Sequence, residues 1–446
     1  MLDFTPSPQM VTLIMFGLLV IGIFTGFPLG FVILGVAFIT GLLFMGPTRV
    51  YGIVGAHTYK LMVNYILLAL PLFVFMGSMI GSSGMAERLF STLYTILGGM
   101  RGGLALTVIV VSTVFAACTG VIAASVTTMG IIAMAPMVAR GYDRALSAGA
   151  VAAGGTLGIL IPPSIMLVIY GPMAEISVGK LFAGAIFPGL LLSGLYILYI
   201  IVYCRVKPNA GPPIPLEERQ AVPAARKLFL AVVYMVPPLA IIFAVLGTIL
   251  FGIATPTEAA GMGAFASIVV AAAFKSLNWQ TLRKAISETL RITAFAGLLT
   301  IGAGVFAAIF LYLRGGEFVT AMVTNVPGGK WASLFIILLV IYLLGMFIEW
   351  IGSIYIVVPV FTPIGAALGF DPVWFAIIIC VAYQTGFLSP PNAHAIFYLK
   401  AVSPPEVTLG DIIKGVVPFI GLITIGLVLC ILFPSIVTWL PSVTVG

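Results

Sequence analysis

The sequence predicts an all-α polytopic membrane protein made of two inverted repeats, and three observations support this prediction. The 446-residue chain is 61% hydrophobic and only 7% charged, whereas soluble domains are about one quarter charged. Apolar runs long enough to cross a bilayer recur from one end to the other. Matching landmarks also recur 228 residues apart. This composition leaves no room for a large soluble domain.

The charged and reactive residues exclude several function classes. The excess of 20 Lys+Arg over 13 Asp+Glu is explained by loop cations that set membrane orientation, so we expect no nucleic-acid partner. Four cysteines without a CxxC pair and two histidines predict inert buried thiols and no metal-ligand cluster. The chain contains no GxxxxGK[ST], HExxH or GxSxG motif, which argues against direct use of ATP and against an enzyme.

Four landmarks keep the same 228-residue spacing and define two related halves. They are a Pro-Pro step, an Asp after a glycine turn, a Ser after a small residue, and an isolated Pro: Pro162 and Pro390, Asp143 and Asp371, Ser125 and Ser353, Pro28 and Pro256. The polar segment 205–227 separates the halves, which gives a first repeat at 1–204, a cytoplasmic linker, and a second repeat at 228–446.

Each half is predicted to contain five crossings and one re-entrant hairpin. Apolar runs give the crossings, a central cluster of glycine and small residues gives each hairpin, and the Pro-Pro steps give broken helices. In the first half the order is 10–26, 28–46, 62–83, an amphipathic piece to 99, a hairpin at 103–138, a broken helix at 145–170, and 181–204. In the second half it is 228–250, 256–274, a short amphipathic segment around Arg283, 291–313, a hairpin at 331–368, a broken helix at 373–399, and 411–440.

The charge distribution supports an inverted arrangement. Five crossings are an odd number, so the second half must enter the membrane upside down. With the linker inside, only five of the 20 basic residues lie outside, as the positive-inside rule requires; these are Arg49, Lys60, Lys180, Arg314 and Lys330. Both termini are then predicted to be periplasmic.

The broken helices predict a binding function. A proline inside a helix costs about 3 kcal/mol, and irregular backbone at membrane depth is tolerated where it lines a polar cavity. Freed carbonyls with a nearby hydroxyl suit sodium, and helix N-termini suit a carboxylate. We therefore expect the breaks at 155–164 and 385–392 to face the hairpin tips at 119–125 and 349–353, forming two cation sites beside one substrate site. The alternative is that each Pro-Pro step is only a structural kink.

These motifs resemble a known family. The segments "GTLGILIPPS", "ACTGVIAAS", "GYDRALSAGAVAAGG" and "QTGFLSPPNAHAIFYLKAVSPPEVTLGDI" resemble the large, DctM-like membrane subunit of tripartite ATP-independent periplasmic (TRAP) transporters. The resemblance covers nearly the whole chain. It implies a bacterial inner-membrane importer of small carboxylates that uses an elevator mechanism, with sodium ions co-transported and no organic cofactor. It also implies two partners, a small four-helix membrane (Q) subunit and a periplasmic substrate-binding (P) protein. The chain starts at the large subunit, so the small subunit is expected to be a separate polypeptide.

The resemblance also implies the site residues. Sodium ligands are expected at the hairpin tips and breaks: Ser125, Gly155, Thr156, Gly158, Pro162, Ser164, Gly352, Ser353, Gln384, Gly386 and Ser389. Substrate contacts are expected at Thr119, Ser125, Ser353, Thr385, Asn392 and His394. Many family members have a "VGLN"-like run where this chain has Asn392-Ala393-His394. The continuation "FYLKAVSPPEV" looks like the branch associated with 2-oxo acids, lactate-like acids or other small carboxylates.

Several single residues have two interpretations. Glu349 at the second hairpin tip either acts on a cation or braces the tip, and repulsion of a carboxylate substrate favours a supporting role. His394 either donates to a backbone carbonyl or contacts substrate, and the first reading is favoured. Asp143 and Asp371 are predicted N-caps, and Glu258 is predicted to meet the amide end of its helix. One alternative function is a sodium–anion symporter or proton-coupled transporter that needs no binding protein. Another is a passive channel, but the sequence contains no filter motif that would support it.

Overall fold

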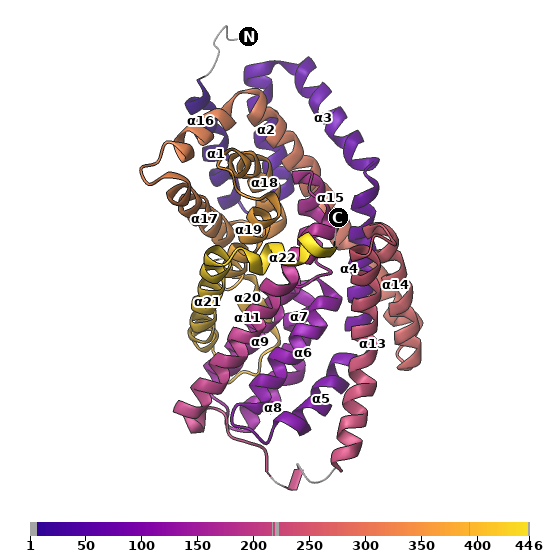
Figure 1. Ribbon diagram of the computed structural model, residues 1–446. Helices are drawn as coiled ribbons and strands as arrows, with labels where there is room; N and C mark the ends of the chain where they lie inside the picture. The colour runs from indigo at the N-terminus through magenta and orange to yellow at the C-terminus, as the bar shows by residue number, and fades with distance from the viewer. Residues whose placement is uncertain (1–6, 216, 219–222, 392, 445–446) are drawn as a thin grey trace.

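The computed structural model describes residues 7–215, 217–218, 223–391 and 393–444, and this part of the chain is helical without β-strands (Figure 1). Eight of its helices are long and apolar enough to cross a membrane, or nine if one bent pair counts as a single span. The predicted all-helical, multi-span membrane fold is therefore confirmed.

The first half contains eleven α-helices and three short 3-10 or π segments in the described residues. In order they are α1 Pro8–Phe24, α2 Leu29–Met45, α3 Pro47–Met62, η1 Tyr65–Leu68, α4 Ala69–Gly81, α5 Met85–Leu97, α6 Gly103–Thr119, α7 Ile122–Met129, η2 Gly130–Met134, α8 Ala135–Ala139, α9 Arg144–Thr156, η3 Leu157–Ile159, α10 Ile165–Ala174 and α11 Val178–Val206.

The second half follows the one-turn segment η4 (Pro208–Ala210) and repeats the order. Its helices are α13 Ala224–Leu250, α14 Pro256–Ala273, α15 Trp279–Tyr312, α16 Gly315–Thr324, α17 Gly329–Phe347, α18 Trp350–Ala367, α19 Pro372–Gly386, α20 His394–Val402, α21 Leu409–Leu432 and α22 Ser435–Thr444. A shift of 228 residues places the first-half elements onto their second-half counterparts, so that α6 matches α17 and α10 matches α20.

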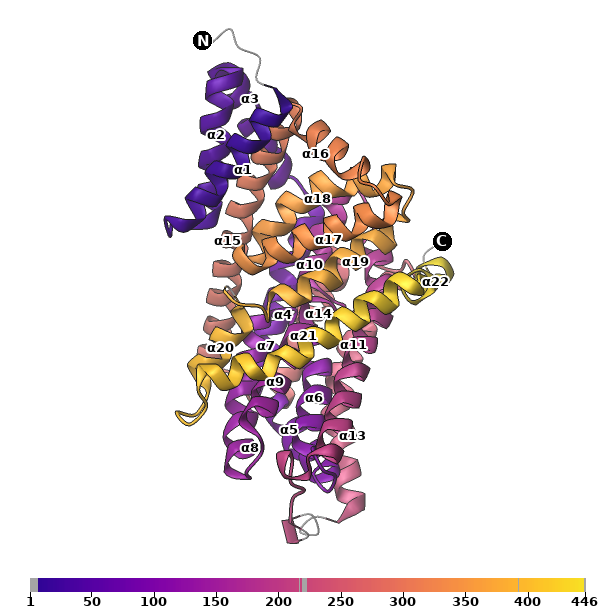
Figure 2. The same cartoon turned by 90° about the vertical axis from the view of Figure 1, so that its left-hand side faces the viewer.

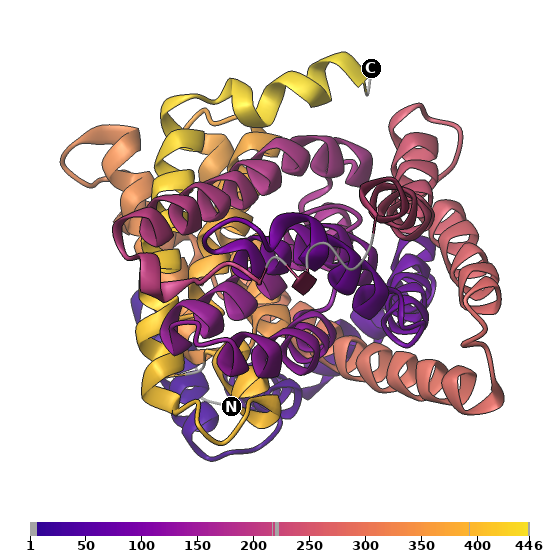
Figure 3. The same cartoon turned by 90° about the horizontal axis from the view of Figure 1, so that it is seen from below.

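The packing of the two halves follows the same correspondence. α2 packs along α15 and its counterpart pair, α14 and α4, packs in the same way; α9 packs on α21 as α19 packs on α11. The α6–α8 hairpin lies at the lower end of Figure 1 and the α17–α18 hairpin lies at the upper end, as inverted repeats require. Seen from below, the helices of residues 224–312 stand along one side of the molecule and the first hairpin lies toward its middle (Figure 3). The exact division into two repeats stays a prediction.

The structure differs from the prediction between residues 47 and 62, ahead of the predicted crossing at 62–83. The structure has an additional helix, α3, which is bent by 56° against the following helix pair η1–α4. The bend is local in origin, because the Asn64 side chain accepts a hydrogen bond from the Ile66 amide (3.1 Å) and starts a new helix there. Pro71 lies in the first turn of α4, where a missing amide is tolerated.

The matching segment of the second half has neither feature. There the predicted short amphipathic segment around Arg283 is not a separate piece, because it forms the first turns of the 34-residue helix α15. α15 crosses the molecule from the linker end toward the end that carries α3 (Figures 1 and 2).

Candidate functional site

Both predicted hairpins are present as two antiparallel helices joined by a tight turn. In the first, Gly120 adopts a left-handed conformation (φ 60°) between α6 and α7. In the second, Ile348 is extended and Glu349 is the N-cap of α18, with its carboxylate accepting a hydrogen bond from the Ile351 amide (3.0 Å). The tip of the first hairpin is therefore formed by the left-handed Gly120, and the tip of the second by the acidic N-cap Glu349.

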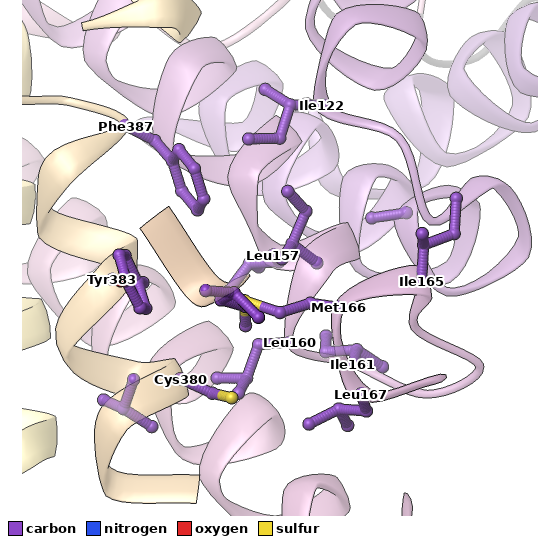
Figure 4. Packing of buried hydrophobic residues seen from close by; sticks show 14 of the residues in the cluster. Ile122, Leu157, Leu160, Ile161, Ile165, Met166, Leu167, Cys380, Tyr383 and Phe387 are labelled. Atoms are coloured by element: carbon purple, nitrogen blue, oxygen red, sulfur yellow. The ribbon is translucent and has the colours of Figure 1, made fainter. Parts of the chain in front are cut away.

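Both predicted helix breaks are also present. α9 ends at Thr156, the chain passes through a cis Pro162–Pro163 bond, and α10 begins after Ser164, whose hydroxyl donates to the Ile159 carbonyl. α19 ends at Gly386 and α20 begins at His394, also after a cis Pro–Pro bond. In Figure 4 the first break faces α19 across apolar side chains, with Leu160 and Met166 opposite Cys380 and Tyr383 of that helix.

In the first half, the break packs tightly against its own hairpin. A Cβ on Gly155 would lie 2.4 Å from a Val126 methyl, and one on Gly158 would lie 2.9 Å from the Ala116 carbonyl oxygen. At the tip, the hydroxyls of Thr119 and Ser125 are 2.7 Å apart and both residues are buried. The predicted ligands Ser125, Gly155 and Gly158 therefore gather in one compact cluster.

The second half forms the corresponding cluster. A Cβ on Gly386 would lie 2.9 Å from the Gly345 carbonyl oxygen, and the Ser353 hydroxyl lies 2.6 Å from that of Tyr383. Ser389 donates to the Thr385 carbonyl at 2.8 Å. The amide of Gln384 is fully buried, yet neither its oxygen nor its nitrogen has a hydrogen-bond partner among the described residues. A buried unpaired amide is costly, and Gln384 therefore keeps hydrogen-bonding groups that no described residue uses.

The helix that follows each break packs against the hairpin of the opposite half. α10 of the first half packs against α18, and α20 of the second half packs against α7. As a result, four helices begin around a single cavity of about 170 Å³. Its lining includes the first residue of each of the four helices: Ile122, Ile165, Trp350 and His394. Helix N-termini carry partial positive charge, and the Glu349 carboxylate lies beside them in the same lining.

The other walls of this cavity come from the long helices outside the hairpins. Leu70 of α4 and Ile292 and Phe295 of α15 close one side, and Tyr398 of α20 and Glu349 lie on the other. Within the described residues, the His394 imidazole makes no hydrogen bond to a carbonyl; its ring lies 6.1 Å from that of Tyr398 and lines the cavity. The favoured interpretation of His394 as a carbonyl donor is thus not what the structure shows.

The structure separates the predicted substrate residues into two groups. His394 and the supporting residue Glu349 line the cavity. Four others lie behind the cavity wall and are buried: Thr119, Ser125, Ser353 and Thr385. Asn392 lies outside the described residues. Of the remaining predicted sodium ligands, Thr156 donates to the Ala153 carbonyl (2.9 Å), Gly352 packs against Leu29, and Pro162 is in the cis bond.

Sequence reasoning missed the aromatic residues of the site. Tyr383 orients Ser353, and Trp350 and Tyr398 line the cavity. The sequence offered one signal for each of them. Tyr383 stands immediately before Gln384, Trp350 is at the hairpin tip, and Tyr398 follows His394 by one helical turn. The three predicted helix-start acids are confirmed: Asp143 accepts from Leu146 N (2.7 Å), Asp371 from Trp374 N (2.8 Å), and Glu258 forms a capping box with Thr255.

The chain matches known transport proteins over nearly its whole length. Residues 13–436 match the family model described as "Tripartite ATP-independent periplasmic transporter, DctM component". A large permease protein of a C4-dicarboxylate TRAP transporter from Pseudomonas aeruginosa is 34% identical over 385 residues, which is 86% of each chain. An isethionate TRAP transporter permease protein, DctMQ, from Oleidesulfovibrio alaskensis is 31% identical over 84% of this chain and 58% of its own length.

One solved structure has a similar fold. The Alcanivorax borkumensis YdaH transporter, described as having an unusual topology, superposes with a TM-score of 0.61 over 96% of this chain and 99% of its own, at 16% identity. At this identity the similarity concerns the fold alone.

Proposed function

The chain belongs to the DctM family of tripartite ATP-independent periplasmic transporter components, and we propose that it carries a small organic acid across the bacterial inner membrane, driven by sodium. The family and the multi-span fold make it the membrane component of a secondary transport system. The cargo, the coupling ion and the residues that bind them are our proposal.

The convergence of four helix N-termini on one cavity is the observation that carries this proposal. The first residues of α7, α10, α18 and α20 line the same space, so the positive ends of four helix dipoles lie around it, although the Ile351 amide of α18 is already bonded to Glu349. The cavity is enclosed by apolar and aromatic side chains, in which an anion is held by oriented dipoles. Its 170 Å³ corresponds to about six water molecules at liquid density, which is the size of a small organic acid. Glu349 is retained there because it caps α18.

We assign the two hairpin–break clusters to sodium. Each offers hydroxyls and backbone carbonyls near a helix end, the oxygen ligands that a hard cation requires. In the second cluster the unpaired Gln384 oxygen and the Ser353 hydroxyl supply such ligands. In the first, Thr119, Ser125 and the backbone at 155–164 do so. A sodium ion beside each helix N-terminus would also add positive charge around the anion.

The packing supports a division into a moving and a fixed unit. α2, α4, α14 and α15 pack on one another and present Leu70 and Phe295 to the cavity. The hairpins, the broken helices, α11 and α21 form the other unit. We propose that the second unit slides along the first, carrying substrate and sodium together, as an elevator mechanism requires.

We propose that the partners are a small membrane subunit and a periplasmic substrate-binding protein. The family name describes a tripartite system, and this chain matches only 58% of the relative named DctMQ. The amphipathic helices α5 and α16 are suited to the lipid interface. From the positive-inside distribution we propose that both termini face the periplasm.

The test is uptake into proteoliposomes that hold this chain and its small subunit, with an inward sodium gradient and radiolabelled succinate and other small carboxylates. We expect uptake that requires both sodium and the matching binding protein, and that Ser164→Ala weakens. Uptake without a binding protein would instead identify a stand-alone symporter, and uptake driven equally by potassium would reject sodium coupling.

A further inference from the structure

A second and larger cavity, here called the outer cavity, lies on the same seam between helices as the first. Its volume is about 430 Å³, and its walls come from α3, η1, α10, α15 and α18. The positive-inside distribution places α3, with Arg49 and Lys60, on the periplasmic side. α3 and the C-terminal end of α15 lie in the upper part of Figure 1, which under this orientation is the periplasmic side.

The two cavities follow each other along three shared helices. On α15 the lining passes from Phe295 to Thr300, on α18 from Ile351 to Tyr355, and on α10 from Ile165 to Ile169. A hydrogen bond between the hydroxyls of Thr300 and Tyr355 joins the walls at the inner end of the outer cavity. The outer cavity therefore lies next to the inner cavity along the same three helices, on the side that we assign to the periplasm.

One wall of the outer cavity presents hydrogen-bond donors. His57 and Lys60 lie one helical turn apart near the end of α3, Asn64 follows at the bend before η1, and all three line the cavity. The Asn64 oxygen is occupied by the Ile66 amide (3.1 Å), so its amide nitrogen is the group left to offer. Within the described residues, no carboxylate lies within 4.0 Å of the Lys60 ammonium. Glu175 is the one acid in the lining, and it follows the end of α10 on the opposite wall.

We propose that the outer cavity is a second anion site, in which Lys60 and Asn64 bind the carboxylate of the incoming organic acid before it reaches the inner cavity. The identity of the ligand rests on the proposed function, whereas the preference for anions rests on the cavity alone. Glu175 lowers this preference on the far wall, and it favours movement of the anion away from α10.

The preference for anions can be measured without transport. All four native cysteines are buried, so a Leu61→Cys variant places one reactive thiol in the cavity wall. The probes are an anionic and a cationic methanethiosulfonate reagent, and the readout is the ratio of their reaction rates with detergent-purified protein. Lys60→Gln should lower the anionic-to-cationic ratio about fivefold, and Glu175→Gln should raise it by a similar factor.

The matched control is Arg49→Gln, which removes the same charge from the other end of α3 and should leave the ratio within about twofold, because exposed charges farther away are screened. Succinate should slow modification of Leu61→Cys, and Lys60→Gln should weaken that protection. If Leu61→Cys does not give monodisperse protein, Met173→Cys on the opposite wall replaces it.

Two results would overturn the proposal. If Lys60→Gln and Arg49→Gln changed the rate ratio equally, general surface charge would explain the preference for anions, and no specific site would be needed. If Lys60→Gln and Glu175→Gln changed the anionic-to-cationic rate ratio in the same direction, the two residues would act together to close the cavity. They would then not act as opposite charges on a bound anion. Because the reagents need no gradient, a failure here is distinguishable from a failure of sodium-driven uptake, which would remove the proposed function and leave the anion preference standing.

Discussion

Gly77 of α4 and Thr119 at the first hairpin tip are in backbone contact: a Cβ on Gly77 would lie 2.3 Å from the Thr119 carbonyl oxygen and 2.7 Å from its Cα. Neither backbone atom belongs to a flexible side chain that could move aside. The matching position in the second half is Val305, so this close approach belongs to the first hairpin alone. α4 and the hairpin lie in different units under the proposed mechanism, which makes Gly77 a point where the two units touch.

Gly77→Ala should therefore destabilise this state of the protein by about 1–3 kcal/mol, because the hairpin must move away from α4. The measurement is thermal unfolding in detergent together with initial rates of uptake. The control is Gly81→Ala one turn later, where a Cβ would meet only the Phe115 ring at 3.8 Å and where alanine favours the helix. Equal effects of the two substitutions would show that contact with Thr119 has no special role.

Gln384 provides a test of the second sodium cluster. Its buried amide is unpaired among the described residues, so Gln384→Leu should leave thermal stability in potassium buffer unchanged or raise it. The stabilisation by sodium should be lost, although sodium at 100 times its dissociation constant would otherwise add about 2.7 kcal/mol. The control is Thr293→Val, which removes a buried hydroxyl that is also unpaired among the described residues but lies outside the clusters. This variant should keep the sodium response. Retention of that response in Gln384→Leu would contradict the assignment.

Two substitutions of Glu349 can distinguish its role as a helix cap from a role of its charge. Its carboxylate caps α18 at the hairpin tip, and an amide oxygen can accept the same hydrogen bond. Glu349→Gln should therefore keep most uptake, whereas Glu349→Ala should lose about 0.5–2 kcal/mol of stability and most activity. Uptake at saturating substrate and thermal unfolding measure the two effects. If Glu349→Gln is as inactive as Glu349→Ala, the charge itself is required.

The sequence was sufficient where a signal is local. The Pro-Pro steps, the hairpin glycines and the capping residues Asp143 and Asp371 act on neighbouring backbone, and the structure has each in its predicted place. The direction of the hydroxyl groups could not be predicted in this way. Thr156 and Thr385 donate to carbonyls three residues back, a local competition that removes them from the cavity.

The long-range features were also beyond the sequence. The partner exchange that brings α20 onto α7 decides which helix starts meet, and no periodicity records it. The bend between α3 and η1 depends on one side-chain cap at Asn64, which a hydropathy pattern does not detect. The pairing of Ser353 with Tyr383 joins residues 30 apart, so only the folded chain reveals it.

The linker between the halves is attached to α5, to the loop that follows it and to the end of the first hairpin, and Glu218 makes two of these contacts. The Glu218 carboxylate accepts hydrogen bonds from the Tyr94 hydroxyl (2.7 Å) and the Arg140 guanidinium (2.8 Å). Backbone bonds from Gly102 to Gly211 (2.8 Å) and from Ile214 to Gly98 (2.8 Å) continue the attachment. Hydrogen bonds from Tyr94 and Arg140 lower the pKa of Glu218 below its usual 4.5, so the stabilising charge is present at neutral pH and is lost only as the pH falls through that lowered value.

Glu218→Gln should release this end of the linker and speed tryptic cleavage in it by about two- to fivefold at both pH 6 and pH 8, because local opening governs proteolysis. The neighbouring acid gives the control: Glu217 is exposed and makes no hydrogen bond or ion pair within the described chain, so Glu217→Gln should be cleaved at the wild-type rate. An equal rate for the two variants would mean that the backbone bonds hold the linker without Glu218. Faster cleavage of Glu218→Gln alone would establish that one carboxylate joins α5, the end of the first hairpin and the linker.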